Sequence, residues 1–546
     1  MLKKELVILS NIFDNPTTKE NIYLTFSKAK YKKYQYNYNI KYFFDIDPNI
    51  NEHDELNLLE RNLFEESKEN KKRWFSLPFK FIYKYLITYN QFYNRLEKYI
   101  NDNNNIKSIE SSKNNSFIFK SVIVNLTEKY DIESILNSKK VDSFSYRHSA
   151  YMASDIPKYK DIDKNNIFIK LYSFYLRIKN HDTFIFPSSI DNDFPKNVNL
   201  FRISVFTIYA KIKRILNVTK NKNYLRHTTI IDFSFDVDIV YCLNDKIWIN
   251  YRNDQIKLIE TILNIYFYNY KYKYLDAIQA KIECYLQSSR TQKVILDETI
   301  DSFRRLMCLT CKKIGVKTEF TPHGMIDEKL QFPLTDNIEY KKKYIPNILA
   351  WNNSSSEYFV NQNINSRAIS YPIVIYPHKV EQKKDILVML SYGDRINLNA
   401  FEDYIIDLLP LQIEKKYNID WKIHQNIFEE SNISMKIQKD FIEKEYNTKI
   451  NFLEHNIKAT SILKNYETII FTTWTTGIYE AALLSVPFII YTKENENIRG
   501  LDNIRLPIAE NLNQLHKLIE HNNKDYLFEI KDSLTANIKL NSYLQI

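Results

Sequence analysis

Hydroxyl and carboxylate side chains gather in one segment, Thr468–Thr492, with the sequence TIIFTTWTTGIYEAALLSVPFIIYT. Its apolar runs predict a buried strand that ends at Phe471 and a helix that begins at Gly477. The turn between them carries the hydroxyls of Thr472, Thr473, Thr475 and Thr476. Because a helix N-terminus presents N–H groups and partial positive charge, this turn predicts a phosphate site. Glu480, one helical turn further on, would accept hydrogen bonds from ribose hydroxyls. The alternative is an ordinary capping Thr followed by a first-turn Glu.

Two histidines and two glycine-containing turns follow other apolar runs. They are His323 with Gly324, Ser391 with Gly393, and His424. In a parallel sheet, ligands sit at the carboxyl ends of the strands, so these residues suit a cleft for a nucleotide monophosphate or diphosphate. A single histidine at a strand end is more often structural or merely exposed, but two in the same register favour the cleft.

Other patterns with metal or redox associations are weak here. D-x-D occurs at 161–163 and 236–238 with no other placed ligand. Cys308 and Cys311 form C-x-x-C inside a predicted helix, without a second pair, which favours two buried helix cysteines over zinc or redox chemistry. We therefore expect no metal and no cofactor.

The elements that must position these residues alternate regularly from Lys293 onward. Strands are expected over 293–297, 316–321, 348–351, 386–391, 420–424, 450–452, 468–471 and 488–491. Helices are expected over 302–314, 398–417, 434–446, 460–465 and 477–485, the first ended by Gly315 as a C-terminal cap. Such alternation predicts a parallel, doubly wound sheet.

The first half of the chain has a different pattern. Residues 1–290 combine short apolar runs with Asn/Lys-rich loops and with aromatic helical stretches over 75–99 and 256–275. A lysine-rich segment over 340–345 leads into Pro346 and predicts a domain boundary. We expect a domain over 1–345, with a long insertion over about 125–290, and a second domain over 346–546.

Composition excludes several classes of protein. Only five glycines occur in 546 residues, whereas the phosphate-binding sequences G-x-G-x-x-G and G-x-x-x-x-G-K-[ST] each need several close together. NAD-binding domains of that type, P-loop NTPases and protein kinases are therefore excluded. The sequence shows neither a signal peptide nor a run long enough to span a membrane, and its four cysteines form no disulfide framework, so we expect a cytoplasmic protein.

The net charge of the chain is +10, and its positive charges are unevenly distributed. Residues 201–230 contain seven Lys/Arg residues and no Asp or Glu. Apolar residues at helical spacing within it predict a basic amphipathic helix, a type that lies on anionic membrane surfaces. The alternative is a helix packed on the protein with a solvated basic face. Nucleic acid is not expected as a partner, because no zinc-finger, helix-turn-helix or RNP signature accompanies the stretch.

The chemistry-bearing segments resemble, as an ordered set, bacterial glycosyltransferases of the GT-B fold that build surface polysaccharide. The set is "strand, helix, strand, HG", then I-x-x-W…EYF, ILVxLSYG, KIH and TTG-x-YEA-x-x-x-x-x-PFIIY, over 293–511. The wider clan includes capsule and lipopolysaccharide transferases, CMP-sialic acid and Kdo transferases, and CDP-glycerol glycerophosphotransferases. The resemblance implies an α/β fold of two Rossmann-like domains (GT-B type) with a large insertion in the N-terminal domain.

The resemblance also implies residue roles. His424, Thr475 and Thr476 would hold the donor phosphate, and Glu480 would meet the ribose. The family follows this histidine with Pro, whereas Gln425 follows here. A metal-independent enzyme of this type needs a carboxylate or histidine to take the acceptor proton. The candidates are Asp297, Glu298 and His323, and the alternative for the acidic pair is an ordinary helix start.

We therefore expect transfer of a sugar from a nucleotide-activated donor to a surface glycan or lipid-linked precursor, at the inner face of the cell membrane. One alternative keeps the fold but transfers a polyol phosphate from a CDP-polyol such as CDP-glycerol. The other is a non-catalytic partner in polysaccharide assembly, with Gln425 as a sign of a degenerate site.

Overall fold

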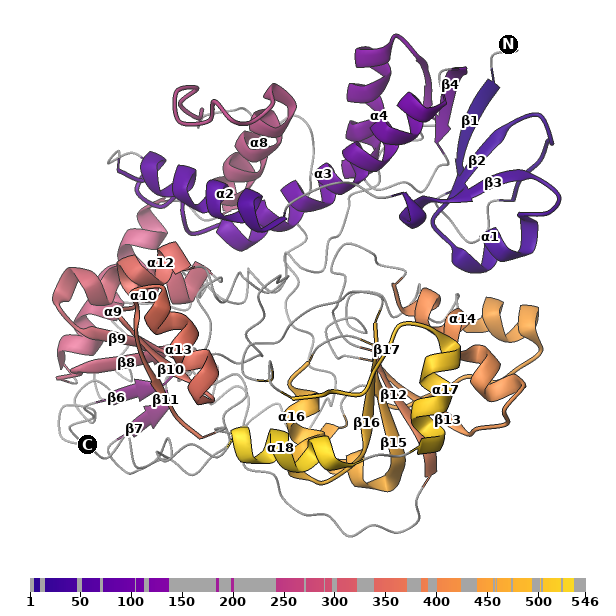
Figure 1. The fold of residues 1–546 in the computed structure, drawn as a ribbon. Helices are drawn as coiled ribbons and strands as arrows, with labels where there is room; N and C mark the ends of the chain where they lie inside the picture. The colour runs from indigo at the N-terminus through magenta and orange to yellow at the C-terminus, as the bar shows by residue number, and fades with distance from the viewer. Residues whose placement is uncertain are drawn as a thin grey trace, which may run out of the picture.

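Three sheets, each with all its strands parallel, organise the chain in a computed structural model (Figure 1). The structure describes residues 4–9, 15–46, 52–68, 72–103, 105–111, 117–136, 183–185, 198–200, 242–269, 272–288, 290–296, 302–321, 338–370, 384–390, 400–423, 439–454, 457, 459–472, 475–492, 501, 504–521 and 524–534. The α/β class expected from the sequence is confirmed.

The first sheet has five strands in the order β3-β2-β1-β4-β5. They are β1 (Lys4–Leu9), β2 (Ile22–Thr25), β3 (Asn39–Tyr42), β4 (Ile106–Ser111) and β5 (Glu133–Leu136), and α1 (Lys28–Tyr34) connects β2 to β3. Leu6, Ile8 and Leu24 are fully buried. The sequence pattern did not predict this sheet, because strands of four to six residues give little periodicity.

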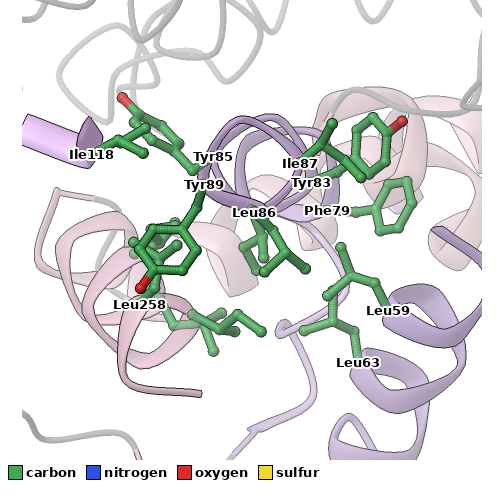
Figure 2. Packing of buried hydrophobic residues seen from close by; sticks show 14 of the residues in the cluster. Leu59, Leu63, Phe79, Tyr83, Tyr85, Leu86, Ile87, Tyr89, Ile118 and Leu258 are labelled. Atoms are coloured by element: carbon green, nitrogen blue, oxygen red, sulfur yellow. The ribbon is translucent and has the colours of Figure 1, made fainter. Parts of the chain in front are cut away.

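Among the described elements, α2 (Glu52–Glu66), α3 (Phe79–Asp102), α4 (Phe117–Tyr130) and α8 (Asn253–Asn269) form a helical layer that joins the first sheet to the second, and α9 (Tyr272–Ser288) packs against α10 (Ser302–Ile314) beside the second sheet. The helix expected over 256–275 is thus two helices. Figure 2 shows α3 with Phe79 facing Leu59 and Leu63 of α2, all three fully buried. Helical spacing of large apolar residues along α3 provides its buried faces.

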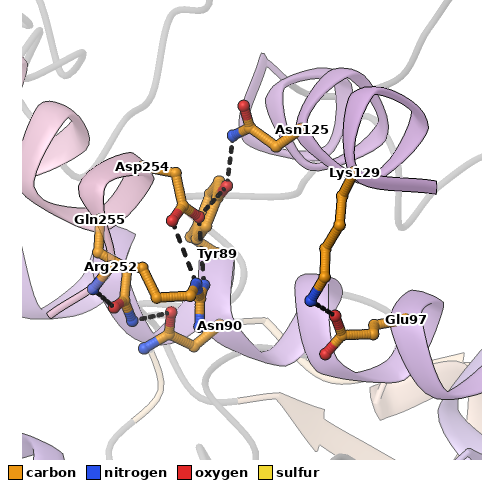
Figure 3. A network of polar contacts seen from close by, with 8 residues as sticks. All are labelled: Tyr89, Asn90, Glu97, Asn125, Lys129, Arg252, Asp254 and Gln255. Atoms are coloured by element: carbon orange, nitrogen blue, oxygen red, sulfur yellow. Dashed lines mark hydrogen bonds and ion pairs between the residues drawn. The ribbon is translucent and has the colours of Figure 1, made fainter. Parts of the chain in front are cut away.

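A polar network fixes α3 against α4 and α8 (Figure 3). Tyr89 of α3 donates its hydroxyl to Asp254 of α8 at 2.7 Å and accepts a hydrogen bond from Asn125 of α4 at 2.6 Å. Arg252 holds the same Asp254 carboxylate at 3.1 and 3.2 Å. Burial first, and then Asp254, raise the pKa of Tyr89, so its hydroxyl stays a donor.

The second sheet has six strands in the order β11-β10-β9-β8-β6-β7. Its strands are β6 (Thr183–Ile185), β7 (Val198–Leu200), β8 (Lys293–Leu296), β9 (Lys317–Phe320), β10 (Asn347–Ala350) and β11 (Asn365–Ala368). The described helices between its strands β8 to β11 are α10 (Ser302–Ile314), α12 (Ile338–Tyr344) and α13 (Asn353–Asn361). As expected, Gly315 follows α10, and its φ of +74° is the left-handed conformation that glycine favours.

The chain passes from the second sheet to the third at a point later than residue 345, which is the boundary expected from the sequence. β10 pairs with β9 and β11, so the second sheet continues to Ala368 and the third begins at Lys384. The lysines before Pro346 belong to α12: Lys341 is fully buried, with its ammonium 4.3 Å from the centre of the Phe320 ring. Lysine stems cover apolar surface well, and in the sequence alone this pattern is indistinguishable from a polar linker.

The third sheet has six strands in the order β14-β13-β12-β15-β16-β17. They are β12 (Lys384–Leu390), β13 (Ile419–Ile423), β14 (Asn451–Phe452), β15 (Tyr466–Phe471), β16 (Phe488–Tyr491) and β17 (Ile508–Ala509). Its helices are α14 (Ala400–Ile413), one that includes residues 439–446, α16 (Gly477–Leu483), α17 (Leu512–His521) and α18 (Asp525–Ser533). The helix expected over 460–465 is instead two 3₁₀ turns, Ala459–Ser461 and Leu463–Asn465.

The first and third sheets are joined through α1 and α14. Lys28 of α1 forms an ion pair with Asp407 of α14 at 2.9 Å, and Tyr42 of β3 donates its hydroxyl to Asp403. Ala29 is fully buried in the core of the third sheet. The basic stretch over 201–230 lies outside the described residues. Of the helices that the structure describes, none is long and apolar enough to span a bilayer.

Candidate functional site

The order of the third sheet places its switch point between β12 and β15, because the chain extends outward from β12 in one direction and then from β15 in the other. Leu390 of β12 pairs with Ile423 of β13, and Met389 pairs with Phe471 of β15, so the three strands end at one edge. Ligands of doubly wound sheets bind outside this edge. The candidate residues that follow these strand ends in the sequence lie outside the described residues. They are Ser391, Gly393, His424 and Thr473.

The turn after β15 is more internally bonded than expected. The backbone N–H and the hydroxyl of Thr472 both lie 3.3 Å from the Met389 carbonyl, so this hydroxyl ties β15 to β12 and is not directed at a ligand. Thr475 accepts from the Gly477 N–H through its hydroxyl at 3.4 Å and from the Ile478 N–H through its carbonyl at 3.0 Å. Much of the donor capacity predicted for phosphate is therefore in use.

The helix that follows begins at Gly477, as expected, but has only seven residues. Its N-cap residue Thr476 has helical backbone angles and makes no side-chain capping bond. The Glu480 N–H donates to the Thr476 carbonyl at 3.2 Å. A short helix with occupied first-turn donors attracts an anion weakly. A phosphate here would therefore need donors from the neighbouring strand ends.

Gly477 has a packing role that the sequence did not reveal. A β-carbon at this position would lie 2.7 Å from Cε1 of Phe471. The Phe471 ring is fully buried and packs edge-on against Phe488, with ring centres 5.7 Å apart. A larger residue at 477 would therefore first distort the turn, whatever its effect on a phosphate.

We expect Gly477→Ala to lower the free energy of unfolding by about 1–3 kcal/mol, the usual cost of overpacking a rigid core. Urea denaturation measures this. The matched double variant Gly477→Ala/Phe471→Leu, which removes the obstructing ring, should lose less than the sum of the two single changes. Strictly additive losses would contradict the contact as the cause.

Glu480 is the acidic residue in the first turn of α16. Burial raises its pKa to about 7. A carboxyl that titrates near neutral pH at a ligand-binding edge is typical of functional sites. The Glu480 side chain is itself half-buried, on a helix whose residues Ile478, Tyr479, Ala481 and Ala482 are buried.

The second sheet presents its own strand ends to this turn. Leu296 of β8 pairs with Phe320 of β9, so the two strands end together, directly before the candidate bases in the sequence. Those bases, Asp297, Glu298 and His323, and the adjoining Gly324 lie outside the described residues. Trp351, which follows β10, contacts Tyr479 of α16 edge-on at 6.1 Å between ring centres.

One apolar cluster confirms that the two sheets meet here. It includes Leu349 and Trp351 from the second sheet together with Phe471, Ile478 and Tyr479 from the third. The turn that carries Glu480 thus abuts the carboxyl edge of the second sheet. The strand expected over 348–351 ends at Trp351, but no sequence pattern could identify the aromatic partner of this side chain.

Two remaining expectations concern metals and thiols. Cys308 and Cys311 are fully buried in α10, and burial raises the pKa of the Cys311 thiol. The interpretation as core cysteines is confirmed. Within the described ranges, no group of three or more His, Cys, Asp or Glu side chains converges.

The sequence matches no protein-family model and no curated protein. Solved structures give partial likenesses. A Methanocaldococcus jannaschii UDP-GlcNAc 2-epimerase in complex with UDP-GlcNAc and UDP is 16% identical over 46% of this chain and 75% of its own, with a TM-score of 0.36. Acinetobacter baumannii MurG is 12% identical over 50% and 76%, with a TM-score of 0.31. The Streptomyces nogalater glycosyltransferase SnogD is 12% identical over 50% and 79%, also at 0.31. At these values the likenesses carry no inference about ligand or activity.

Proposed function

We propose that this protein is a metal-independent glycosyltransferase that moves a sugar from a nucleotide-activated donor to a surface glycan or a lipid-linked precursor. The observation that carries the proposal is the position of Glu480. It lies in the first turn of the helix that follows β15, one of the two strands at the switch point. Its neighbour in sequence, Tyr479, contacts Trp351 at the carboxyl edge of the second sheet.

In this proposal the third sheet binds the donor. Glu480 accepts hydrogen bonds from ribose hydroxyls, and the hydroxyl of Thr476 contributes to the phosphate site. Because the first-turn N–H groups are largely occupied, His424 supplies the principal donor to phosphate. A neutral histidine donates one hydrogen bond, and a protonated one donates a stronger, charge-assisted bond.

The second sheet contributes the acceptor side. A carboxylate or imidazole from Asp297, Glu298 or His323 takes the proton of the acceptor hydroxyl as that oxygen attacks the anomeric carbon. The nucleotide diphosphate or monophosphate leaves with the bonding electron pair, and donor-side hydrogen bonds stabilise its charge. The basic stretch over 201–230 would hold the enzyme at an anionic membrane surface where a lipid-linked acceptor resides.

A nucleotide panel tests the proposal. We expect one of UDP, GDP, CMP or CDP to raise the melting temperature, since a ligand at about 100 times its Kd stabilises a protein by about 2.7 kcal/mol. His424→Ala should weaken that binding about 10- to 100-fold, the value of one charge-assisted hydrogen bond. The matched control is His521→Ala, a change to an exposed histidine in the last turn of α17.

The outcomes separate the alternatives. Transfer from CDP-glycerol by a CDP-binding protein would replace the sugar donor with a polyol phosphate donor. No stabilisation by any nucleotide would refute the proposal and favour a non-catalytic assembly partner. Equal affinities for wild type and a folded His424→Ala variant would remove His424 from the site.

A further inference from the structure

A basic cavity of about 350 Å³ lies among the helices that pack beside the second sheet. It is bounded by the C-terminal ends of α2, α10 and α12. Phe64 comes from the last turn of α2 and Lys68 follows that helix, Lys313 comes from the end of α10, and Lys343 from the end of α12. Since α10 starts near the carboxyl ends of the strands, its C-terminal end lies on the opposite side of the sheet. The cavity is therefore separate from the candidate site.

Most of the cations in its wall already have carboxylate partners. Lys68 pairs with Glu65 at 2.5 Å, Lys313 pairs with Glu283 at 2.6 Å, and Arg73 pairs with Asp276. Lys343 differs: within the part of the chain that the structure describes, no carboxylate lies within ion-pair distance of it. Its ammonium instead lies 4.5 Å from the ring centre of Phe64 and 5.4 Å from that of Tyr344.

Lysines near the C-terminal end of a helix commonly donate hydrogen bonds to its last carbonyl groups, but Lys343 is not the lysine that does so here. Lys312 of α10 caps the end of α12 instead, because its ammonium donates to the Lys343 carbonyl at 3.4 Å. Burial, followed by the charges of Lys312 and Lys68, lowers the pKa of Lys343. Glu65 and Glu60 act in the opposite direction without cancelling this effect. The Lys343 side chain is exposed to solvent. An anion in the cavity would therefore reach Lys343 and stabilise its charged form.

Aromatic rings form the other part of the wall. Phe64 and Tyr344 stack with ring centres 5.2 Å apart, and the Arg73 guanidinium lies 5.0 Å from the ring centre of Trp74. The volume falls within the range of small-molecule sites, about 300–1,000 Å³. A wall that combines cations with ring faces suits a ligand with an anionic group and a flat apolar body.

We propose that this cavity, lined by Lys68, Lys313, Lys343, Phe64, Trp74 and Tyr344, binds an organic phosphate, with the phosphate at Lys343 and the apolar body against the rings. The site is independent of the proposed sugar transfer. The phosphate can belong to a free metabolite or to a lipid headgroup, since both present the same chemistry to the lysine.

Calorimetric titration of the full chain with phenyl phosphate, and separately with inorganic phosphate, tests the site. Wild type should bind phenyl phosphate more tightly than inorganic phosphate, because only the former engages the rings. Lys343→Met keeps the apolar stem and should raise the phenyl phosphate Kd about 10- to 100-fold, as expected for loss of one charge-assisted bond. Lys257→Met, on an exposed position of α8, is the matched control and should bind as wild type does.

A second arm distinguishes the two sources. Sedimentation with phosphatidylcholine vesicles, with and without phosphatidic acid, identifies a lipid headgroup when pelleting needs both phosphatidic acid and Lys343. Phenyl phosphate binding without such pelleting identifies a free metabolite. If Lys343→Met does not fold, Lys313→Gln serves in its place, with the same direction of change expected. Unchanged phenyl phosphate affinity in the folded variant, or no binding by wild type in either arm, would overturn the proposal.

Discussion

Glu60→Gln is expected to lower the free energy of unfolding by about 3–5 kcal/mol, because it removes a carboxylate that is ion-paired with a buried guanidinium. Arg305 of α10 and Glu60 of α2 form an ion pair at 2.6 Å, and both side chains are essentially fully buried. The guanidinium also lies 4.2 Å from the ring centre of Phe79 on α3. The pair therefore holds the helical layer to the second sheet.

Urea denaturation measures the loss, and two further variants identify its cause. Glu65→Gln removes a partner from the exposed Lys68 ion pair, where the side chains are 66% and 45% exposed, and should cost under about 1 kcal/mol. The double variant Glu60→Leu/Arg305→Met replaces both charges with apolar groups and should recover most of the stability. If the double variant were as unstable as Glu60→Gln, the loss would come from packing and not from the broken ion pair.

Glu480 should make the protein less stable as the pH rises from about 4.5 to about 7. Burial raises the pKa of Glu480 from 4.5 to about 7, so the folded state binds the proton more tightly than the unfolded state. Below about 4.5 both states are protonated and there is no penalty. Above about 7 both are ionised and the folded state carries the full cost, up to about 3 kcal/mol.

The measurement is the free energy of unfolding across this pH range for wild type and Glu480→Gln. The variant keeps a neutral side chain of the same shape, so its stability relative to wild type should increase with pH by up to about 3 kcal/mol and level off above about pH 7. Taking the difference cancels every other titrating group. Glu467→Gln, an exposed position on β15, is the matched control and should follow wild type.

Parallel curves for Glu480→Gln and wild type would show that the carboxyl is solvated, and would remove the main physical reason for a ligand at this turn. Under the proposed function, a ribose hydroxyl that donates to the ionised carboxylate lowers the pKa of Glu480. A saturating nucleotide should then flatten the pH dependence of the wild type. Stability and ligand binding thus test the same side chain in two independent ways.

Local sequence determined the elements of the second half of the chain. The run KVIL became β8, the helix after it ends at Gly315 in the left-handed conformation, and α16 begins at Gly477. The burial of Cys308 and Cys311 in α10 was also predictable. These features depend on hydrophobic runs, helical spacing and the backbone freedom of glycine, which act over a few residues and are therefore legible in the sequence.

Tertiary structure alone decided which strands share a sheet and what each site residue contacts. β10 joined the second sheet, a first sheet formed from short strands, and Lys341 became a core residue. Thr472 bonds to Met389, 83 positions away, and Glu480 acquires its raised pKa from burial. Such properties arise from neighbours distant along the chain. Hydrogen-bond partners and dielectric surroundings exist only once those segments are brought together, so the sequence indicated where to look but not what these residues would contact.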